Sequence, residues 1–244
     1  MKYELGDSLY DAIKKGAQKF PLAYNAYVRA KAKYIMRRDR ALLQKYGLDV
    51  LSMVHSKLYG VVPYYAAYGT LLGIIREGGF LHHDDDVDFC VLPCDMSIRQ
   101  WMEPLFKCGF EFLGGYSYEG KIKQIALTYR KLRVDFSLGE RDGNGNLRYF
   151  EFWHQKGVVY SRKYALTCYA NQSIEIPSLV DFQLNGTVTQ IPMNYLDVLT
   201  AEYGKSWRTP DYSWNPTSQS NGKLFHSVAL PGEGYCMVPL SEIS

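Results

Sequence analysis

The fold is decided by the stretch from Tyr64 to Leu92, which reads YYAAYGTLLGIIREGGFLHHDDDVDFCVL. Its first five residues are apolar and aromatic, which predicts a short buried strand. Gly69 breaks that run, and Thr70 is then predicted to N-cap a helix that ends at Gly78-Gly79. The stretch is therefore expected to fold as a strand, a glycine turn and a helix.

This turn is expected to bind an anion. Free backbone N–H groups point outward at a helix N-terminus, where they bind phosphate. Gly69 would let a phosphate approach the backbone closely, because it has no side chain. Arg76 lies one to two turns along the same helix and is expected to reach the same anion. Gly69, Thr70 and Arg76 are thus candidate substrate-binding residues.

An acidic run follows this helix and leads into a second predicted strand. Residues two apart on a strand point to one face, so Asp86 and Asp88 should project together. Asp84 joins them if the extended conformation begins early. Adjacent carboxylates repel each other, and one would ordinarily stay protonated unless a cation binds. Oxygen ligands suit Mg²⁺, with Mn²⁺ as the alternative.

Two other interpretations of the acidic run are a solvated acidic loop and a calcium loop. The calcium-loop pattern requires a glycine after its third acidic or amide position and a glutamate further on. No glycine follows Asp88, and no glutamate stands at the required distance. The glycine turn upstream favours the metal site over the solvated loop.

Residues 121–138, KIKQIALTYRKLRVDFSL, predict two further strands. In the second strand the apolar residues alternate with Arg133, Asp135 and Ser137. An aspartate in a strand is unfavourable by propensity, so Asp135 is expected to have a partner. We interpret it as the third carboxylate of the metal site. The alternative is a surface salt bridge with Arg133 or Lys131.

Composition limits the class of protein. The 244 residues carry a formal net charge of +3 and suit one large domain, or a domain with an appendage. No apolar run approaches membrane-spanning length and the N-terminus does not read as a signal peptide, so a cytoplasmic location is expected. The five cysteines are scattered, which favours reduced thiols over a zinc site built from Cys90, Cys94 and Cys108.

Three regions are predicted along the chain. Residues 1–40 form a basic helical segment, 41–212 the catalytic domain, and 213–244 an irregular C-terminal tail packed on that domain. The basic segment is either a solvated helix face or a surface for anionic lipid or a phosphate-bearing polymer. A cytoplasmic protein of this kind would lie peripherally at the inner face of the membrane.

The remaining elements are read from periodicity and turn residues. A helix is predicted over 95–109, with a kink or an early stop at Pro104. Asn185-Gly186 predicts a hairpin turn. Ile191-Pro192 is expected to open a last helix that ends at Gly204. Lys205, just beyond it, is a further candidate for contact with phosphate.

Motifs between residues 40 and 212 resemble, in order and spacing, those of the LicD / fukutin-related family of phosphotransferases. The resemblance rests on the motifs Tyr68-Gly69-Thr70-Leu71-Leu72-Gly73-Ile74-Ile75-Arg76, Gly79-Phe80, Asp84-Asp85-Asp86-Val87-Asp88, Val134-Asp135-Phe136, Ile191-Pro192, Tyr195-Leu196, Tyr203-Gly204-Lys205-Ser206-Trp207 and Pro210. Where the family usually has Pro-Trp, this chain has His82-His83. His83 is therefore a candidate contact for a phosphate or the metal.

The resemblance implies an α+β fold, a nucleotidyltransferase-like mixed sheet flanked by helices. It implies transfer of phosphocholine or a polyol phosphate from a CDP-activated donor to a sugar hydroxyl. By the same resemblance, Asp86, Asp88 and Asp135 match the family's metal and catalytic carboxylates, and Asp84 a further acidic position. The acceptor would be a glycan or lipid-linked glycan of capsule, teichoic acid or lipopolysaccharide, and no nucleic acid is expected as a partner.

Two other functions stay open. A nucleotidyltransferase that attaches the nucleotide itself would use the same metal site. A non-catalytic metal- or sugar-binding module is the third reading, although pure binding does not need Asp135 as well as Asp86 and Asp88. The donor head group also stays open, because choline favours an aromatic cage and the candidate rings are many. These rings are Tyr116, Tyr118, Trp153, Trp207 and Trp214.

Overall fold

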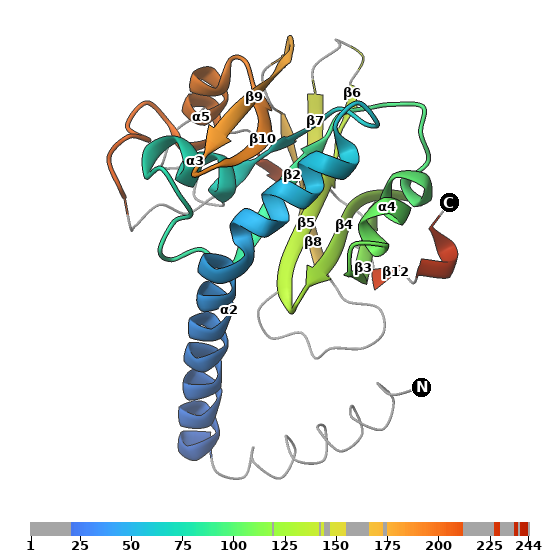
Figure 1. Cartoon of the computed structure of the whole chain (residues 1–244). Coiled ribbons are helices and arrows are strands. Elements are labelled where there is room, and N and C mark those ends of the chain that lie inside the picture. Colours follow the sequence, from blue (N-terminus) through green and yellow to red (C-terminus); the bar gives the residue numbers. More distant parts are fainter. Residues whose placement is uncertain are drawn as a thin grey trace.

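The computed structural model describes residues 21–118, 120–141, 143, 147–154, 166–172, 175–211, 227–229, 237–238 and 240–243. A central sheet carries helices on one face and a smaller sheet on the other (Figure 1). A hairpin and two short helices close one end. This α+β arrangement confirms the predicted fold class.

The central sheet has six strands in the order β1-β2-β5-β4-β3-β12. Their bounds are β1 Tyr64–Ala66, β2 Asp86–Val91, β3 Phe110–Tyr118, β4 Lys121–Tyr129, β5 Leu132–Leu138 and β12 Met237–Val238. β2 and β5 run parallel, and every other neighbouring pair is antiparallel. The sheet is therefore mixed, as predicted.

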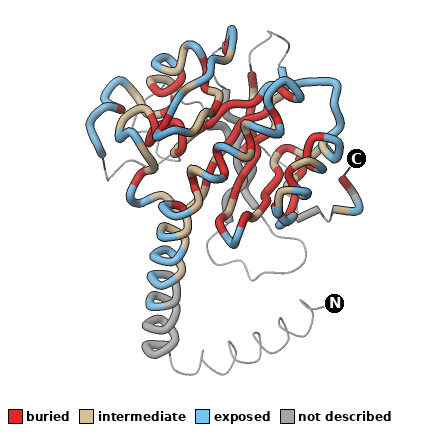
Figure 2. The backbone as a smooth tube through the Cα atoms, in the orientation of Figure 1, coloured by how far each residue is buried: buried red, intermediate tan, exposed pale blue. Residues whose placement is uncertain are grey.

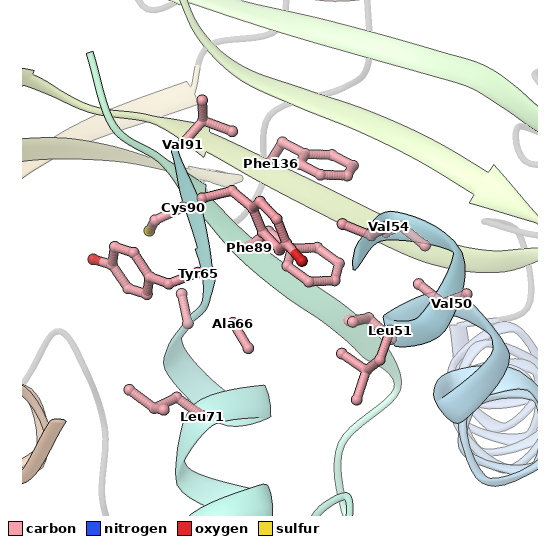
Figure 3. Packing of buried hydrophobic residues seen from close by; sticks show 14 of the residues in the cluster. Val50, Leu51, Val54, Tyr65, Ala66, Leu71, Phe89, Cys90, Val91 and Phe136 are labelled. Atoms are coloured by element: carbon pink, nitrogen blue, oxygen red, sulfur yellow. The ribbon is translucent and has the colours of Figure 1, made fainter. Parts of the chain in front are cut away.

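Helices α2 (Pro21–Leu58) and α4 (Ile98–Phe106) cover the apolar face of this sheet. Val50, Leu51 and Val54 of α2 pack against the β2 and β5 side chains in Figure 3. The rings of Phe89 and Phe136 stack there with centroids 5.2 Å apart. Burial of these residues provides the main apolar driving force for folding.

The second sheet has the order β11-β8-β7-β6 and packs on the opposite face of the central sheet. Its strands are β6 Glu140–Arg141, β7 Leu147–His154, β8 Leu166–Gln172 and β11 Ser227–Ala229. Tyr65 of β1 donates a hydrogen bond of 3.2 Å to the hydroxyl of Tyr149 on β7. The second sheet thus covers the aspartate-bearing face of the central sheet near Tyr65. This contact does not involve the aspartates themselves.

The hairpin of β9 (Leu179–Leu184) and β10 (Thr187–Pro192) confirms the turn predicted at Asn185-Gly186. Both turn residues have positive φ, 48° and 80°, as a two-residue hairpin turn requires. The last helix, however, is α5 (Tyr195–Tyr203), and Pro192 ends β10 instead of opening the helix. Pro192 lacks an N–H but is still accommodated at the end of an edge strand.

Helix α4 also differs in part from its prediction. Ser97 caps it in a capping box with Gln100, and the helix continues through Pro104 to Phe106. The predicted helix over 95–109 is therefore shorter at both ends. Gly109 follows with a φ of 91°, a conformation that suits glycine after a helix.

The N-terminal half of α2 projects from the body as a single helix (Figures 1 and 2). α2 passes residue 40, the predicted limit of the basic segment, without a break. Residues 1–20 lie outside the described part of the chain. Within the described part, no helix combines the length and apolar character needed to cross a membrane.

Most of the predicted tail, 213–244, also lies outside the described residues. The described pieces are not irregular, because β11 pairs with β8 and β12 pairs with β3. A short 3-10 helix (Leu240–Glu242) follows, and Ile243 is buried in the main core. These long-range pairings could not be read from a local sequence pattern.

Candidate active site

Three aspartates come together on the polar face of the central sheet, where β2 and β5 lie side by side. Asp86 and Asp88 are two residues apart on β2, and Asp135 of β5 is opposite Asp88 in the parallel register. One carboxylate oxygen of each lies within 4.8 Å of the others. The structure thus brings together the three residues predicted as metal ligands and catalytic groups.

Thr70 connects helix α3 (Tyr68–Arg76) to the acidic strand. It was predicted to cap this helix, but Ala67 occupies the N-cap and Thr70 lies within the first turn, fully buried. The hydroxyl Oγ1 of Thr70 accepts a hydrogen bond of 2.9 Å from the backbone N–H of Asp88. Thr70 therefore helps to position the backbone of Asp88, and its role in binding substrate stays a prediction.

Asp135 is held in place by two neighbours. Nε of Arg133 lies 3.0 Å and 2.9 Å from the two carboxylate oxygens of Asp135. Nε2 of Gln124 on β4 donates a further hydrogen bond of 3.1 Å to Oδ2. The salt bridge considered as the alternative role of Asp135 therefore exists, and it exists together with the carboxylate cluster.

The aspartates perturb one another electrostatically. Burial raises the pKa of Asp88 well above its ordinary value, and the charges of Asp86, Asp84 and Asp135 raise it further. Burial and the charge of Asp135 likewise raise the pKa of Asp86. The pKa of Asp135 is raised by burial, although Arg133 opposes this. Clustered carboxylates of this kind favour either protons or a bound cation.

Asp84 lies against the start of helix α3. A Cβ added at Gly69 would lie 3.2 Å from Cγ of Asp84 and closer still to its Oδ2. The space in front of Gly69, in which a phosphate was predicted, therefore contains the Asp84 carboxylate. A negative charge is favourable there because the helix N-terminus carries partial positive charge.

Asp84, Asp85 and Asp86 form a second group of carboxylates within 4.8 Å of one another. Burial raises the pKa of Asp84 to about 6, with Asp85 as the next cause. Its Oδ2 is buried without a hydrogen-bond partner in the described structure. The two groups share Asp86, so the acidic site is continuous from the α3 terminus to Asp135.

The other candidate substrate-binding residues are placed differently. Arg76 is in the last turn of α3, where it pairs with Glu77 and donates to the backbone carbonyl of Trp207 at 3.1 Å. His83 is exposed, and its ring lies edge-on to that of His82. Lys205 is exposed on the segment that follows α5. None of these three belongs to the two carboxylate groups.

Sequence reasoning missed two residues beside the site and misjudged a third. Gln124 and Arg40 were not singled out, and Arg133 was considered only as an alternative partner for Asp135. Burial raises the pKa of Asp85, while the charges of Arg40 on α2 and of Arg133 lower it. Arg40 has its Nε buried without a hydrogen-bond partner in the described structure. Only its place in a basic run could have drawn attention to Arg40.

The donor set fits a magnesium or manganese ion. Asp86, Asp88 and Asp135 offer oxygen ligands only, as Mg²⁺ prefers, and one oxygen of each lies within 4.8 Å of the others. Burial is the main cause of the raised pKa values of these carboxyl groups, and a bound cation would favour their charged forms. In the described part of the chain, the groups able to hold a metal contain aspartates alone, so the zinc alternative finds no support.

A mixed sheet carries paired aspartates on a strand beside a glycine-led helix, which is the arrangement that the resemblance to a nucleotidyltransferase-like fold implies. A family model described as LicD/FKTN/FKRP, nucleotidyltransferase domain, matches residues 61–192. The match spans more than half of the chain, and the protein belongs to this family. It includes Asp86, Asp88, Asp135 and Arg133, and it excludes Arg40 and Lys205.

A search of curated proteins found no match to the chain. The family therefore carries the functional assignment at a coarse level. Membership indicates a transferase with a phosphotransferase-like, glycan-modifying function. The resemblance noted in the sequence is confirmed at this level.

Proposed function

We propose that the protein is a metal-dependent phosphotransferase that moves a phospho-alcohol group from a CDP-activated donor to a sugar hydroxyl. The group would be phosphocholine or a polyol phosphate, and the acceptor a cell-surface glycan such as capsule, teichoic acid or lipopolysaccharide. The observation that supports this most strongly is the convergence of Asp86, Asp88 and Asp135 within a domain of this family.

In this proposal Asp86 and Asp88 hold the Mg²⁺ ion with Asp135, and Thr70 fixes the backbone of Asp88. The ion, when bound, would neutralise the donor pyrophosphate and the charge that develops on the leaving phosphate. Mn²⁺ would serve in the same way. The parallel register of β2 and β5 aligns the three ligands without need for a flexible loop.

Asp135 is the proposed general base. The acceptor hydroxyl attacks the phosphorus that bears the alcohol, the bond from this phosphorus to the bridging oxygen breaks, and CMP leaves. Asp135 takes the proton of the hydroxyl. Because Arg133 and Gln124 hold the carboxylate, it presents a fixed oxygen to the acceptor, and proton transfer in a fixed geometry is efficient.

The positions of the candidate aromatic side chains bear on whether the donor carries choline or a polyol. Trp207 and Tyr118 are buried, and the side chains of Trp153 and Trp214 lie outside the described residues. Tyr116 is half-buried, but its phenol raises the pKa of Arg133 against the effect of burial, so it lies beside a guanidinium. A second cation next to Arg133 would be repelled, which favours a polyol over choline at this ring.

The test is calorimetric titration with CDP-choline, CDP-ribitol and CDP-glycerol, each with Mg²⁺ and with a chelator. We expect one donor to bind only when metal is present, and Asp88→Asn to abolish that binding. The matched control is Asp95→Asn, because Asp95 is an exposed aspartate on the loop before α4. If no donor binds wild-type protein with metal, the donor assignment is wrong.

A nucleotidyltransferase activity is the second candidate, because the matched family model describes a nucleotidyltransferase domain. The same carboxylates would then direct attack at the nucleotide phosphorus. Mass spectrometry of an acceptor glycan after turnover separates the two. A mass increase equal to phospho-alcohol supports the main proposal, and an increase equal to a nucleotide supports the second.

We also propose that the projecting part of α2 contacts an anionic membrane, where a lipid-linked acceptor would be found. Its exposed residues include Lys33, Arg37 and Arg38, together with Tyr34 and Met36. Basic and apolar side chains on one exposed helix suit an anionic lipid interface. Sedimentation with liposomes should depend on phosphatidylglycerol content, and Lys33→Glu with Arg37→Glu should remove it. Sedimentation independent of anionic lipid would contradict the contact.

A further inference from the structure

Arg133 lies on the same face of the central sheet as Asp86, Asp88 and Asp135. Its ion pair with Asp135 accounts for only part of its guanidinium. It lies two residues before Asp135 on β5, and its Cα is opposite that of Asp86 on β2. Its charge lowers the pKa values of Asp86 and Asp88, against the larger effect of burial. The guanidinium therefore lies among the same carboxylates that would hold a metal.

The contacts of Arg133 do not use all the N–H donors of its guanidinium. Both bonds to Asp135 come from Nε, which carries a single hydrogen. A guanidinium has five N–H donors, and the phenol oxygen beside it, that of Tyr116, accepts at most two. Within the described part of the chain, at least two N–H groups on the terminal nitrogens therefore remain without a partner. The side chain of Arg133 is 41% exposed, so part of it is open to solvent.

Electrostatics indicates what that ligand is. The carboxylate of Asp135 lies beside Arg133 and would offset part of the repulsion between the guanidinium and a divalent cation, and an anion bound near both would offset more of it. Arginine binds phosphate oxygens in a bidentate manner, and such charge-assisted bonds are among the strongest in proteins. A diphosphate bound at this site would offer oxygens both to the terminal nitrogens of Arg133 and to a metal held by the aspartates. The planar guanidinium can do this while its Nε stays on Asp135.

The other predicted phosphate-binding cations are less well placed. Arg76 already bonds Glu77 and the carbonyl of Trp207, and Lys205 lies on an exposed segment after α5. Gly69 has the Asp84 carboxylate in front of it. Among the described residues, Arg133 is the cation that forms an ion pair with a member of the Asp86, Asp88 and Asp135 group.

We infer that Arg133 has two functions: its Nε positions Asp135, and its terminal nitrogens bind the diphosphate of the substrate. The inference rests on the proposed function in its choice of site, and it adds a ligand class and a residue to that site. It also explains why an arginine precedes the proposed base by two residues on the same strand face.

The experiment measures metal and anion binding separately, in wild type, Arg133→Gln and Arg133→Lys. Mn²⁺ binding is followed by electron paramagnetic resonance, and binding of inorganic pyrophosphate by calorimetry at saturating Mn²⁺. The control is Arg130→Gln, which removes an arginine in the turn between β4 and β5, three residues before Arg133. That guanidinium lies over the rings of Tyr46 and Tyr129, at 5.2 Å and 5.3 Å, away from the carboxylates.

For Arg133→Gln we expect pyrophosphate affinity to fall about 10-fold or more, as for loss of a charge-assisted bidentate contact. Mn²⁺ affinity should change much less than pyrophosphate affinity, because Gln124 still holds Asp135 and the removal of a positive charge beside the carboxylates offsets the lost contact. Arg133→Lys should keep part of the pyrophosphate affinity, since it keeps the charge and loses the fork. Arg130→Gln should bind both ligands as wild type does.

Three outcomes would overturn the inference. They are wild-type protein that does not bind pyrophosphate, Arg133→Gln that binds it normally, and parallel loss of metal and anion binding in both variants. The last outcome would show a purely structural role. If pyrophosphate binds through Arg133 but no CDP-linked donor binds, the inference stands and the proposed function fails.

Discussion

The two faces of the central sheet are built from the same strands and have opposite character. On β2 and β5, Phe89 and Phe136 stack beneath α2 and α4, while Asp88 and Asp135 face the other way. Neighbouring residues on a strand point to opposite faces, so one strand contributes to both. The comparison shows that the apolar face stabilises the fold and that the carboxylate face, without a cation, works against it.

The largest expected effect comes from removing a carboxylate. Asp88→Asn should lower transfer activity by roughly 1000-fold or more, because a ligand of the catalytic metal is lost. Steady-state assays with the donor identified by calorimetry would measure it. The same variant should unfold at a higher temperature than wild type in chelator, since mutual repulsion is relieved. An unchanged rate would contradict the assignment of Asp88 to the site.

The next effect lies on the apolar face. Phe136→Ala removes a ring that contacts Phe89 and Trp101, each with a centroid 5.2 Å away. We expect a loss of about 3–5 kcal/mol in the free energy of unfolding, as for other buried aromatic truncations. Chemical denaturation measures this loss, and Phe136→Leu should recover much of it. A loss below about 1 kcal/mol would show that this face is not tightly packed.

A smaller loss of stability is expected from removing the hydrogen bond between Thr70 on α3 and the backbone of Asp88 on β2. Thr70→Val leaves the partly buried N–H of Asp88 without its acceptor, which should cost about 1–3 kcal/mol of stability. Metal affinity should also fall, because the backbone of Asp88 is less constrained. Thr70→Ser keeps the hydroxyl and is the matched control for both measurements. Equal metal affinity in the Val and Ser variants would exclude a positioning role for this hydroxyl.

The smallest effect is a dependence of stability on pH. The pKa values of Asp86, Asp88 and Asp135 are raised in the folded protein, and that of Asp84 is raised to about 6. The folded state therefore binds more protons than the unfolded chain above the ordinary carboxyl pKa, about 4. Stability should fall as pH rises from there through the raised values.

Differential scanning calorimetry in chelator should show this as a melting temperature a few degrees higher at pH 5.5 than at pH 7.5. Saturating Mg²⁺ should remove the difference, because the cation replaces the protons. Asp84→Asn is the control, and its pH dependence should be weaker than that of wild type. A melting temperature that rises with pH in chelator would contradict the repulsion between these groups.

Local patterns in the sequence were enough to predict many elements. The alternation of β5, the hairpin at Asn185-Gly186 and the adjacency of Asp86 and Asp88 all depend on neighbours within a few residues. A period of two is a local property of an extended backbone, and so is the positive φ of an Asn-Gly turn. For this reason the mixed α+β class and the family resemblance were both predicted before the structure.

Other features needed the assembled fold. Pro192 ends a strand because Leu179 pairs with it, although the sequence favoured a helix start there. Thr70 is buried by the acidic strand, so its hydroxyl bonds Asp88 and does not cap its own helix. Asp84 approaches Gly69 across the α3–β2 connection. Such contacts join residues distant in the chain, and no local pattern encodes them.

The sequence by itself determined which residues could form an acidic site. The residues two positions before and after Asp86 are both aspartates, and side chains two apart on a strand point to one face. The tertiary structure decided how that site is completed. The parallel pairing of β2 and β5 places Asp135 beside Asp88, and the same register places Arg133 beside Asp86. Strand pairing is chosen by the packing of the whole sheet against its helices, and electrostatic neighbours follow from that choice.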